Sequence, residues 1–261
     1  MAAWVRFCGA LLLGFVAVPA MAADLGPIEA PVAPVVSDWR FGATFYGWAS
    51  GISGDVGVLG LGPAPVDVKP DEALRDLKGA LMASFGAVSQ DWMLLGDVMW
   101  ARLGDNGRIG DSILGYDATL NQVMVQGLVG YRLPIKLDRL DLRGTVGFRY
   151  VYLDADVSIG PVFSPLGVDV GGQEQWIDPT VGLYAKYDFT DRWFATLIGD
   201  VGGFDVGSKL TWQAYGAIGY NWTKTISTVI GYRAIYEDYE HGGFVYDTTQ
   251  QGVLVGLGIH W

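Results

Sequence analysis

The sequence predicts an all-β fold: an antiparallel transmembrane β-barrel of about ten strands, with eight or twelve strands left open. Segment after segment alternates apolar residues with small or polar ones at a period of two, which is typical of strands. Mean hydropathy is positive, at +0.28, yet no internal apolar run is long enough for a membrane-spanning helix. In lipid, only bundled helices and closed barrels satisfy every backbone polar group. The absence of helical spans therefore favours the barrel.

Composition narrows the class of protein further. The 261 residues suffice for one large β domain or two small ones, and glycine (38 residues) and aromatic residues (13%) are frequent. The net charge of −11 argues against nucleic acid as a partner, because phosphates require a basic surface. The single cysteine, Cys8, lies within the first 22 residues, so disulfides and cysteine-based sites are excluded from the rest of the chain.

The N-terminal residues have the features of a secretory leader. Arg6 supplies a positive charge, and residues 10–18 form an apolar stretch that is too short to span a membrane. Residues 20–22 read Ala-Met-Ala, which fits a signal-peptidase site. We therefore expect residues 1–22 to be a signal peptide.

A proline-rich stretch follows the leader. Residues 23–37 contain Pro27, Pro31 and Pro34, and proline at this density favours an extended, solvated backbone. This stretch is predicted to be a short periplasmic lead-in, and residues 38–261 are predicted to be the barrel.

Ten segments of the predicted barrel show the alternation. In each segment the apolar face is expected to contact lipid, and the polar or small face is expected to line the interior. The predicted strands are 39–53, 78–90, 91–104, 117–133, 140–156, 174–189, 192–206, 209–223, 225–240 and 248–261.

The connections alternate between short and long, which is what an outer-membrane-type barrel requires. An even number of strands places both chain ends on the periplasmic side, together with the short turns. The connection 207–208 is the one short member of the long set, and residues 54–77 contain a possible small hairpin and a helical stretch at 71–77. The predicted turns are 89–91, 134–139, 190–191 and 223–224, and the predicted loops are 54–77, 105–116, 157–173 and 241–246.

The last strand carries a further signal. One of its faces is uniformly apolar and ends in an aromatic ring: Val253, Val255, Leu257, Ile259 and Trp261. This pattern resembles the C-terminal targeting strand of bacterial outer-membrane β-barrels. The resemblance implies that this strand is an assembly signal read by the barrel-assembly machinery.

Three stretches resemble an uncharacterised family of small outer-membrane barrels from Gram-negative (proteobacterial) bacteria. They are residues 199–223 (GDVGGFDVGSKLTWQAYGAIGYNWT), 231–261 (GYRAIYEDYEHGGFVYDTTQQGVLVGLGIHW) and 45–58 (FYGWASGISGDVGV). The resemblance implies the barrel fold and the cell outer membrane as its location. It implies no activity.

Charged residues at inward positions predict a lumen charge network. Five are basic and four are acidic, and opposite charges should pair because an unpaired ion away from water is costly. A filled lumen fits the narrow interior of a ten-stranded barrel, and an open polar pore is the alternative. The predicted network comprises Asp97, Arg132, Arg143, Arg149, Asp178, Lys186, Asp200, Arg233 and Glu237.

Two histidines raise a hydrolase alternative. His241 lies in a predicted loop beside Glu237, Asp238 and Glu240. Omptin-type outer-membrane proteases also have ten strands, with Asp and His at the extracellular rim, and such pairs can activate a water. No matching omptin motif is present. His260 faces inward at the periplasmic end, where Ser227 is a conceivable partner for nucleophilic chemistry, at a depth unlike that of enzymes that act at the outer leaflet. We predict no catalytic residue.

Metal binding has little support in the sequence. Two histidines and one leader cysteine do not make a typical zinc site. Acidic residues of the first loop could attract Ca²⁺ or bridge to lipopolysaccharide, and solvated loop charge explains them equally well. These residues are Asp55, Asp67, Asp71, Glu72 and Asp76. No metal site and no cofactor are predicted.

The predicted function is that of a monomeric outer-membrane barrel with a filled polar lumen and a structural or interaction role at the cell surface. A narrow porin-like channel for small solutes is the first alternative, and an outer-membrane hydrolase is the second. The expected partners are outer-membrane lipid, lipopolysaccharide and, during biogenesis, the barrel-assembly machinery, with no nucleic acid among them.

Overall fold

The structure is a computed structural model, and it describes most of the predicted barrel. The described residues are 38–57, 62–108, 114–135, 137–161 and 168–261. The predicted signal peptide and the proline-rich lead-in lie outside them.

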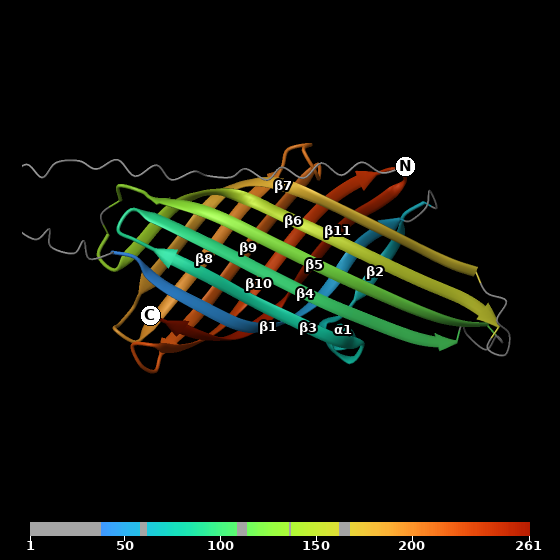
Figure 1. The fold of residues 1–261 in the computed structure, drawn as a ribbon, viewed down its shortest axis with the longest axis horizontal. Coiled ribbons are helices and arrows are strands. Elements are labelled where there is room, and N and C mark those ends of the chain that lie inside the picture. Colours follow the sequence, from blue (N-terminus) through green and yellow to red (C-terminus); the bar gives the residue numbers. More distant parts are fainter. Residues whose placement is uncertain (1–37, 58–61, 109–113, 136, 162–167) are drawn as a thin grey trace, which may run out of the picture. The chain divides into compact units, whose positions relative to one another are not determined.

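Ten antiparallel strands form a closed barrel, as the sequence predicts (Figure 1). Each strand pairs with its neighbour in the sequence, and the barrel closes where β1 pairs with β11, from Gly42 opposite His260 to Gly57 opposite Val245. The strands are β1 (Arg40–Gly57), β3 (Leu77–Val88), β4 (Trp92–Arg108), β5 (Leu114–Arg132), β6 (Leu140–Pro161), β7 (Val168–Asp188), β8 (Trp193–Gly203), β9 (Leu210–Asn221), β10 (Ile226–His241) and β11 (Phe244–His260).

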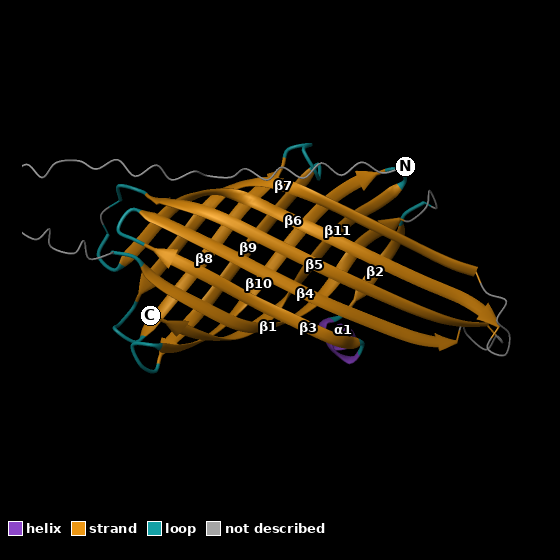
Figure 2. Cartoon of the chain, in the orientation of Figure 1, coloured by secondary structure: helices purple, strands orange, loops and turns teal. Residues whose placement is uncertain are grey.

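The first long connection contains the predicted hairpin and helix. Strand β2 (Ala64–Val68) pairs with the far end of β1, and helix α1 (Pro70–Arg75) leads into β3. Proline at the first helical position has its φ preset for a helix, and the Glu72 carboxylate accepts a hydrogen bond from the Lys69 backbone N–H at 3.1 Å. Figure 2 shows α1 as the short purple helix beside the start of β3. No helix of the described residues is long and apolar enough to cross a membrane.

Three predicted loops are shorter than expected. Strands β4 and β5 extend to Arg108 and from Leu114, and β6 and β7 extend to Pro161 and from Val168, so most of 105–116 and 157–173 is paired strand. The apolar alternation ends where the strands leave the lipid, but backbone pairing continues because it needs no apolar face. The predicted loop 241–246 is a tight turn at Gly242 and Gly243, whose φ values are 57° and 90°.

Strand lengths are unequal around the barrel. Strand β6 has 22 residues and β7 has 21, whereas β8 has 11 and β9 has 12. A transmembrane β-strand needs about 9–11 residues. Strands β4 to β7 therefore form a sheet that projects beyond the rest of the barrel at the end opposite the short turns (Figure 1).

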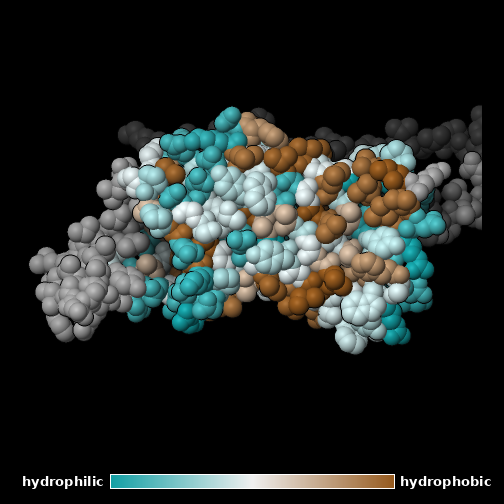
Figure 3. Space-filling view, turned by 180° about the vertical axis from the view of Figure 1, so that it is seen from behind, coloured by the Kyte–Doolittle hydropathy of each residue, from teal (hydrophilic) through white to brown (hydrophobic). Residues whose placement is uncertain are grey.

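The outer face carries an apolar band. Large apolar side chains such as Leu94, Leu197 and Ile230 are exposed on it, and Figure 3 shows hydrophobic side chains gathered on the outside of the strands with hydrophilic ones toward the ends. Aromatic pairs mark the short-turn side, where a girdle belongs. These pairs are Phe41–Trp261, Trp92–Tyr131, Tyr187–Phe189, Trp193–Tyr220 and Tyr220–Trp222.

Candidate functional site

A hydrogen-bonded network crosses the middle of the lumen. At one side, the Arg233 guanidinium donates to the Asp97 carboxylate at 2.9 Å and to the Tyr46 hydroxyl at 3.2 Å. The Tyr46 hydroxyl donates to the same carboxylate at 2.9 Å. Arg233 and Asp97 are both buried, so a close pair with good geometry is the arrangement that makes their burial tolerable.

Glutamines carry the network across the lumen. The Arg233 Nε–H donates to the Gln213 side-chain oxygen at 2.8 Å, and the Gln213 amide donates to Gln126 at 3.1 Å and to Asp200 at 3.0 Å. The Gln126 amide donates to the same Asp200 oxygen at 2.9 Å. Side chains from β10, β9, β5 and β8 are thereby joined in one layer.

A second buried ion pair completes the layer. The Arg149 Nη2 lies 2.7 Å from Asp200 Oδ1, and both side chains are fully buried. Arg149 also donates to the Thr211 hydroxyl, which donates to the backbone carbonyl of Tyr236 at 2.9 Å. We define the lumen network as Tyr46, Asp97, Gln126, Arg149, Asp200, Thr211, Gln213 and Arg233.

An apolar layer lies directly on the extracellular side of the lumen network. Successive inward residues of a strand are two positions apart. On β1, β4, β5, β6 and β10, the next inward residue on the extracellular side of the network residue is apolar: Trp48, Met99, Met124, Val151 and Ile235. With the stacked pair Trp176 and Tyr239, whose ring centroids are 4.1 Å apart, they form a buried cluster. We define the apolar layer as Trp48, Met82, Met99, Met124, Val151, Leu153, Trp176, Ile235, Tyr239, Phe244 and Tyr246.

The periplasmic half of the lumen is hollow. A cavity of about 1350 Å³ reaches from the mouth, at Arg40 and Trp261, to Asp97 and Arg233 of the lumen network. Small inward residues make the space: a Cβ added at Gly86 would meet no atom within 4 Å. We refer to this cavity as the vestibule. The network is its inner wall.

Comparisons with known proteins bear on this architecture. The outer membrane protease OmpT from Escherichia coli superimposes with a TM-score of 0.56 at 11% identity, over 87% of this chain and 99% of that chain. The chain folds as an outer-membrane β-barrel. Ail, the attachment invasion locus protein of Yersinia pestis, gives 0.40 at 12% identity over 85% and 98% of the two chains, and Neisserial surface protein A gives 0.34 at 13% over 85% and 97%. No family model and no curated protein matches.

The outer-membrane β-barrel fold and its apolar outer band support the predicted location in the outer membrane. At this low identity the likeness to OmpT concerns the fold alone. The residues that line this lumen must therefore be assessed from their own geometry.

Four of the nine predicted lumen charges meet in the lumen network: Asp97, Arg149, Asp200 and Arg233. They form two ion pairs, as expected of opposite charges in a narrow interior. Their part in function stays a prediction.

Three other predicted charges lie near the periplasmic end of the barrel. Arg143 forms two hydrogen bonds of 2.9 Å with Asp141, and Arg132 lies 3.3 Å from the same carboxylate. Lys186 pairs with Asp188 at 2.6 Å. Each of these cations therefore pairs with a carboxylate that is missing from the predicted set.

The last two predicted charges, Asp178 and Glu237, lie on the extracellular side of the network. Asp178 accepts hydrogen bonds from the Ser208 backbone N–H at 2.6 Å and the Ser208 hydroxyl at 2.8 Å, so it anchors the turn between β8 and β9. Glu237 is 1% exposed, and its Oε1 has no hydrogen-bond partner among the described residues.

The neutral members of the network are absent from the predicted charge set. Tyr46, Gln126, Thr211 and Gln213 occupy inward positions that the alternation identifies, but a search restricted to charged residues passes over them. The signal that could have found them was inward position combined with hydrogen-bonding capacity. Asp141 falls on the same inward register as Arg143 and could have been found in this way.

The acidic residues near His241 point in different directions. Glu237 points into the barrel, as its place in the predicted lumen charge network requires, because it shares the inward register of Arg233. Glu240 pairs instead with Lys209. Its hydrogen bond and the nearby Asp238 raise the pKa of the Lys209 ammonium group.

His260 and Ser227 do meet, inside the vestibule. The Ser227 hydroxyl and His260 Nε2 are 2.9 Å apart. A hydrolytic Ser–His pair also requires a third group that orients the imidazole, whereas Nδ1 of this ring lies against the backbone of Gly42. The pair fits a polar contact between neighbouring strands.

The predicted assembly strand has the expected orientation. The side chains of Val253, Val255, Leu257, Ile259 and Trp261 are exposed on the outer face of β11.

Among the described residues, no group of three or more His, Cys, Asp or Glu is arranged to hold a metal ion. In the first connection, Asp71 pairs with Arg75 at 3.0 Å.

Proposed function

We propose that this outer-membrane β-barrel has a sealed lumen and serves a structural or interaction role at the cell surface. The observation that carries the proposal is the pair of stacked layers in the lumen, the lumen network and the apolar layer. A solute entering the vestibule meets two buried ion pairs first and packed methionine and aromatic side chains next. Removing one partner of a buried ion pair is strongly unfavourable, which favours a closed state.

The projecting sheet is our candidate for the interaction surface. Strands β4 to β7 extend further than β8 and β9, and this length exceeds what the membrane requires. Its described acidic residues include Asp117, Asp154, Asp156 and Glu174. A surface of this kind favours partners that present cationic groups or bound divalent cations.

The proposal assigns no catalytic residue. Of the two histidines, His241 has Glu237 turned away from it into the barrel, and the imidazole of His260 contacts the Ser227 hydroxyl and forms no hydrogen bond with a described carboxylate. We further propose that the barrel is monomeric, that its partners are outer-membrane lipid and lipopolysaccharide, and that β11 is the segment read by the barrel-assembly machinery.

A narrow channel is the second candidate function, and the vestibule is the observation that favours it. The cavity of about 1350 Å³ crosses the periplasmic half of the lumen. A rearrangement of Arg233 or Arg149 alone would leave the apolar layer in place, so channel opening requires both layers to move.

Conductance in a planar lipid bilayer tests the proposal. The purified barrel is expected to give no discrete current steps, whereas a variant that truncates both layers, Arg233→Ala with Trp48→Ala, is expected to give them. Heat-modifiable migration on gels verifies that both proteins are folded. Discrete, salt-dependent steps from the unaltered barrel would overturn the sealed lumen in favour of the channel.

A further inference from the structure

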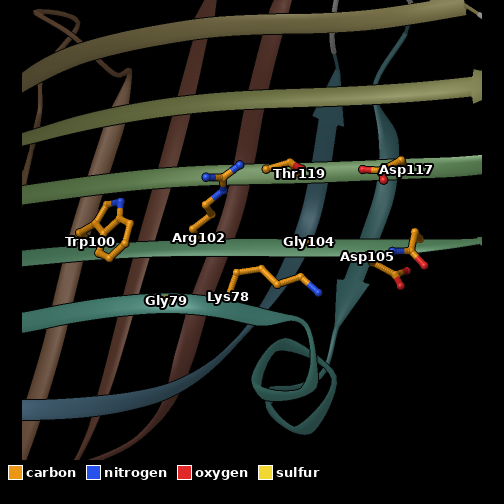
Figure 4. A pocket seen from close by; sticks show the side chains of 9 residues that line it. Lys78, Gly79, Trp100, Arg102, Gly104, Asp105, Asp117 and Thr119 are labelled. Carbon is orange, nitrogen blue, oxygen red and sulfur yellow. The ribbon is translucent and has the colours of Figure 1, made fainter.

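A polar patch lies on the outer face of β3, β4 and β5, above the apolar band. It surrounds an opening of about 330 Å³ (Figure 4). In Figure 4 the Lys78 side chain runs between β3 and β4 alongside Gly104, and the Arg102 guanidinium lies over β5 near Thr119. We refer to Lys78, Trp100, Arg102 and Thr119 as the rim patch.

Strand alternation places the rim patch outside the barrel. On β4 the inward residues Met93 and Met99 are buried, whereas Leu94 on the opposite register is exposed to lipid. Trp100 and Arg102 share the register of Leu94, so they also face outward.

A β-bulge brings Lys78 to the same side. The pairing of β3 with β4 shifts between Leu77 and Gly79, and a bulge re-aims side chains in this way. Lys78 Cε consequently lies 3.0 Å from the position that a Cβ on Gly104 would occupy, on the outward register of β4.

The patch lies at the height of lipid headgroups. Trp92 belongs to the aromatic girdle on the periplasmic side, in contact with Tyr131, and ten residues separate it from Arg102 along β4. At ~3.3 Å per residue and a tilt of ~40°, these ten residues rise ~25 Å, which is the height of the apolar band. Trp100 is then the interfacial aromatic residue, with its indole N–H donating to Asn121 at 2.8 Å, and Arg102 lies just outside the band.

The two cations of the rim patch are not paired with carboxylates of described residues. Neither Lys78 nor Arg102 forms an ion pair with a described residue, in contrast to the exposed cations Arg75 and Lys209. The carboxylates that line the opening, Asp105 and Asp117, lie further toward the loop end of their strands. Both cations line the same opening, Arg102 on the β5 side of β4 and Lys78 on its β3 side (Figure 4), and this arrangement favours an anion.

We propose that the rim patch binds a phosphate group on the headgroup of an outer-leaflet glycolipid of the lipopolysaccharide type. Arg102 supplies the planar fork that suits phosphate oxygens, and Lys78 supplies a second positive charge. The Thr119 hydroxyl and the Trp100 ring border the sugar of the headgroup, while the acyl chains cover the apolar band below. This assignment is independent of whether the lumen conducts.

Lipid binding to the detergent-solubilised barrel tests the proposal. Native mass spectrometry measures how much bisphosphorylated lipid A is retained as it is titrated, for the unaltered protein and for Lys78→Gln with Arg102→Gln. Retention is expected to weaken by about tenfold for each lost cation. Dephosphorylated lipid A is expected to bind the unaltered protein as weakly as phosphorylated lipid A binds the variant.

The matched control is Lys69→Gln with Arg75→Gln, which removes the same two charges from the same end of the barrel. It is expected to retain lipid A normally. Equal losses in the two double variants would overturn the site, since they would reflect net charge alone. Equal retention of dephosphorylated and bisphosphorylated lipid A by the unaltered protein would overturn the phosphate as the bound group. If the rim double variant does not fold, the single variant Arg102→Lys replaces it. This variant keeps the charge but loses the planar fork, so it is expected to retain less lipid A than the unaltered protein. Full retention of lipid A by both Arg102→Lys and Arg102→Gln would contradict the proposal.

Discussion

The two halves of the lumen use the same strands and the same alternation but are filled differently. On the periplasmic side the inward positions include Gly42, Thr44, Ser84, Gly86, Gly256 and Gly258, and the vestibule results. On the extracellular side the next inward positions are large, among them Trp48, Met82, Met99, Met124 and Trp176, and the space is filled. In a barrel of fixed strand number, side-chain size therefore decides whether the interior is open or sealed.

The boundary between the halves is polar. Two arginines and two aspartates lie where the lumen changes from hollow to filled, and the glutamines join them into one layer. Arg233 lines the vestibule, and the apolar layer lies on the extracellular side of both arginines. Four predictions sharpen this comparison.

Removing one partner of a buried ion pair at the boundary should have the largest effect on stability. Arg149→Met leaves Asp200 buried without its cation, and it is expected to lower the free energy of unfolding by about 3–5 kcal/mol. Urea unfolding in lipid vesicles, followed by tryptophan fluorescence, measures the loss. The double variant Arg149→Met with Asp200→Asn should recover part of it; a loss below about 1 kcal/mol for Arg149→Met would place the pair in a wet environment.

Truncating a side chain in the filled half should have the second-largest effect on stability. Met124→Ala removes a side chain that is 1% exposed, and a cavity in a packed cluster costs about 2–5 kcal/mol. The matched control is Leu95→Ala, which removes an aliphatic side chain from the vestibule wall and should cost clearly less. Equal losses in the same unfolding assay would contradict the division of the lumen into a filled and a hollow half.

The polar contact in the vestibule should matter less. Ser227→Ala removes the hydrogen bond to His260, and one such bond contributes about 0.5–1.5 kcal/mol. The same unfolding measurement applies, with Thr225→Ala, which removes an exposed hydroxyl from the turn before β10, as its control. A loss above about 3 kcal/mol would mean that Ser227 has more than one buried partner.

Adding a methyl group to the vestibule should have the smallest effect. Gly86→Ala places a Cβ where no atom lies within 4 Å, so the change is expected to be neutral or to stabilise by up to about 1 kcal/mol through the unfolded chain. Gly182→Ala is the opposite case, because its Cβ would meet the Gly199 carbonyl oxygen at 2.2 Å. If both variants unfold at the same urea concentration, the close approach of the Gly199 carbonyl oxygen to Gly182 is wrong.

Much of this arrangement was accessible from the sequence, because period-two alternation fixes which face each residue occupies. It predicted the ten strands, the outward face of β11 and the inward positions of Asp97, Arg149, Asp200 and Arg233. Connection length separated the short turns from the other connections. These are local properties, and each can be read within a window of a few residues.

The remainder depends on relations between strands that are distant in the sequence. Arg143 could have paired with Asp178 as well as with Asp141, and only the register of the barrel decides. The strand extensions at 105–108 and 157–161 were missed because paired strands above the membrane need no apolar face. The position of Lys78 depends on a bulge, which one strand alone does not reveal.

Cysteine accessibility tests the sealed half most directly, because no cysteine follows Cys8 in the sequence. Single variants Ser84→Cys in the vestibule and Met99→Cys in the apolar layer are placed in folded barrels in lipid vesicles, and labelling by a charged maleimide is timed. Ser84→Cys is expected to react within minutes, and Met99→Cys is expected to react only after unfolding. Equal rates in the folded barrels would contradict the sealed lumen.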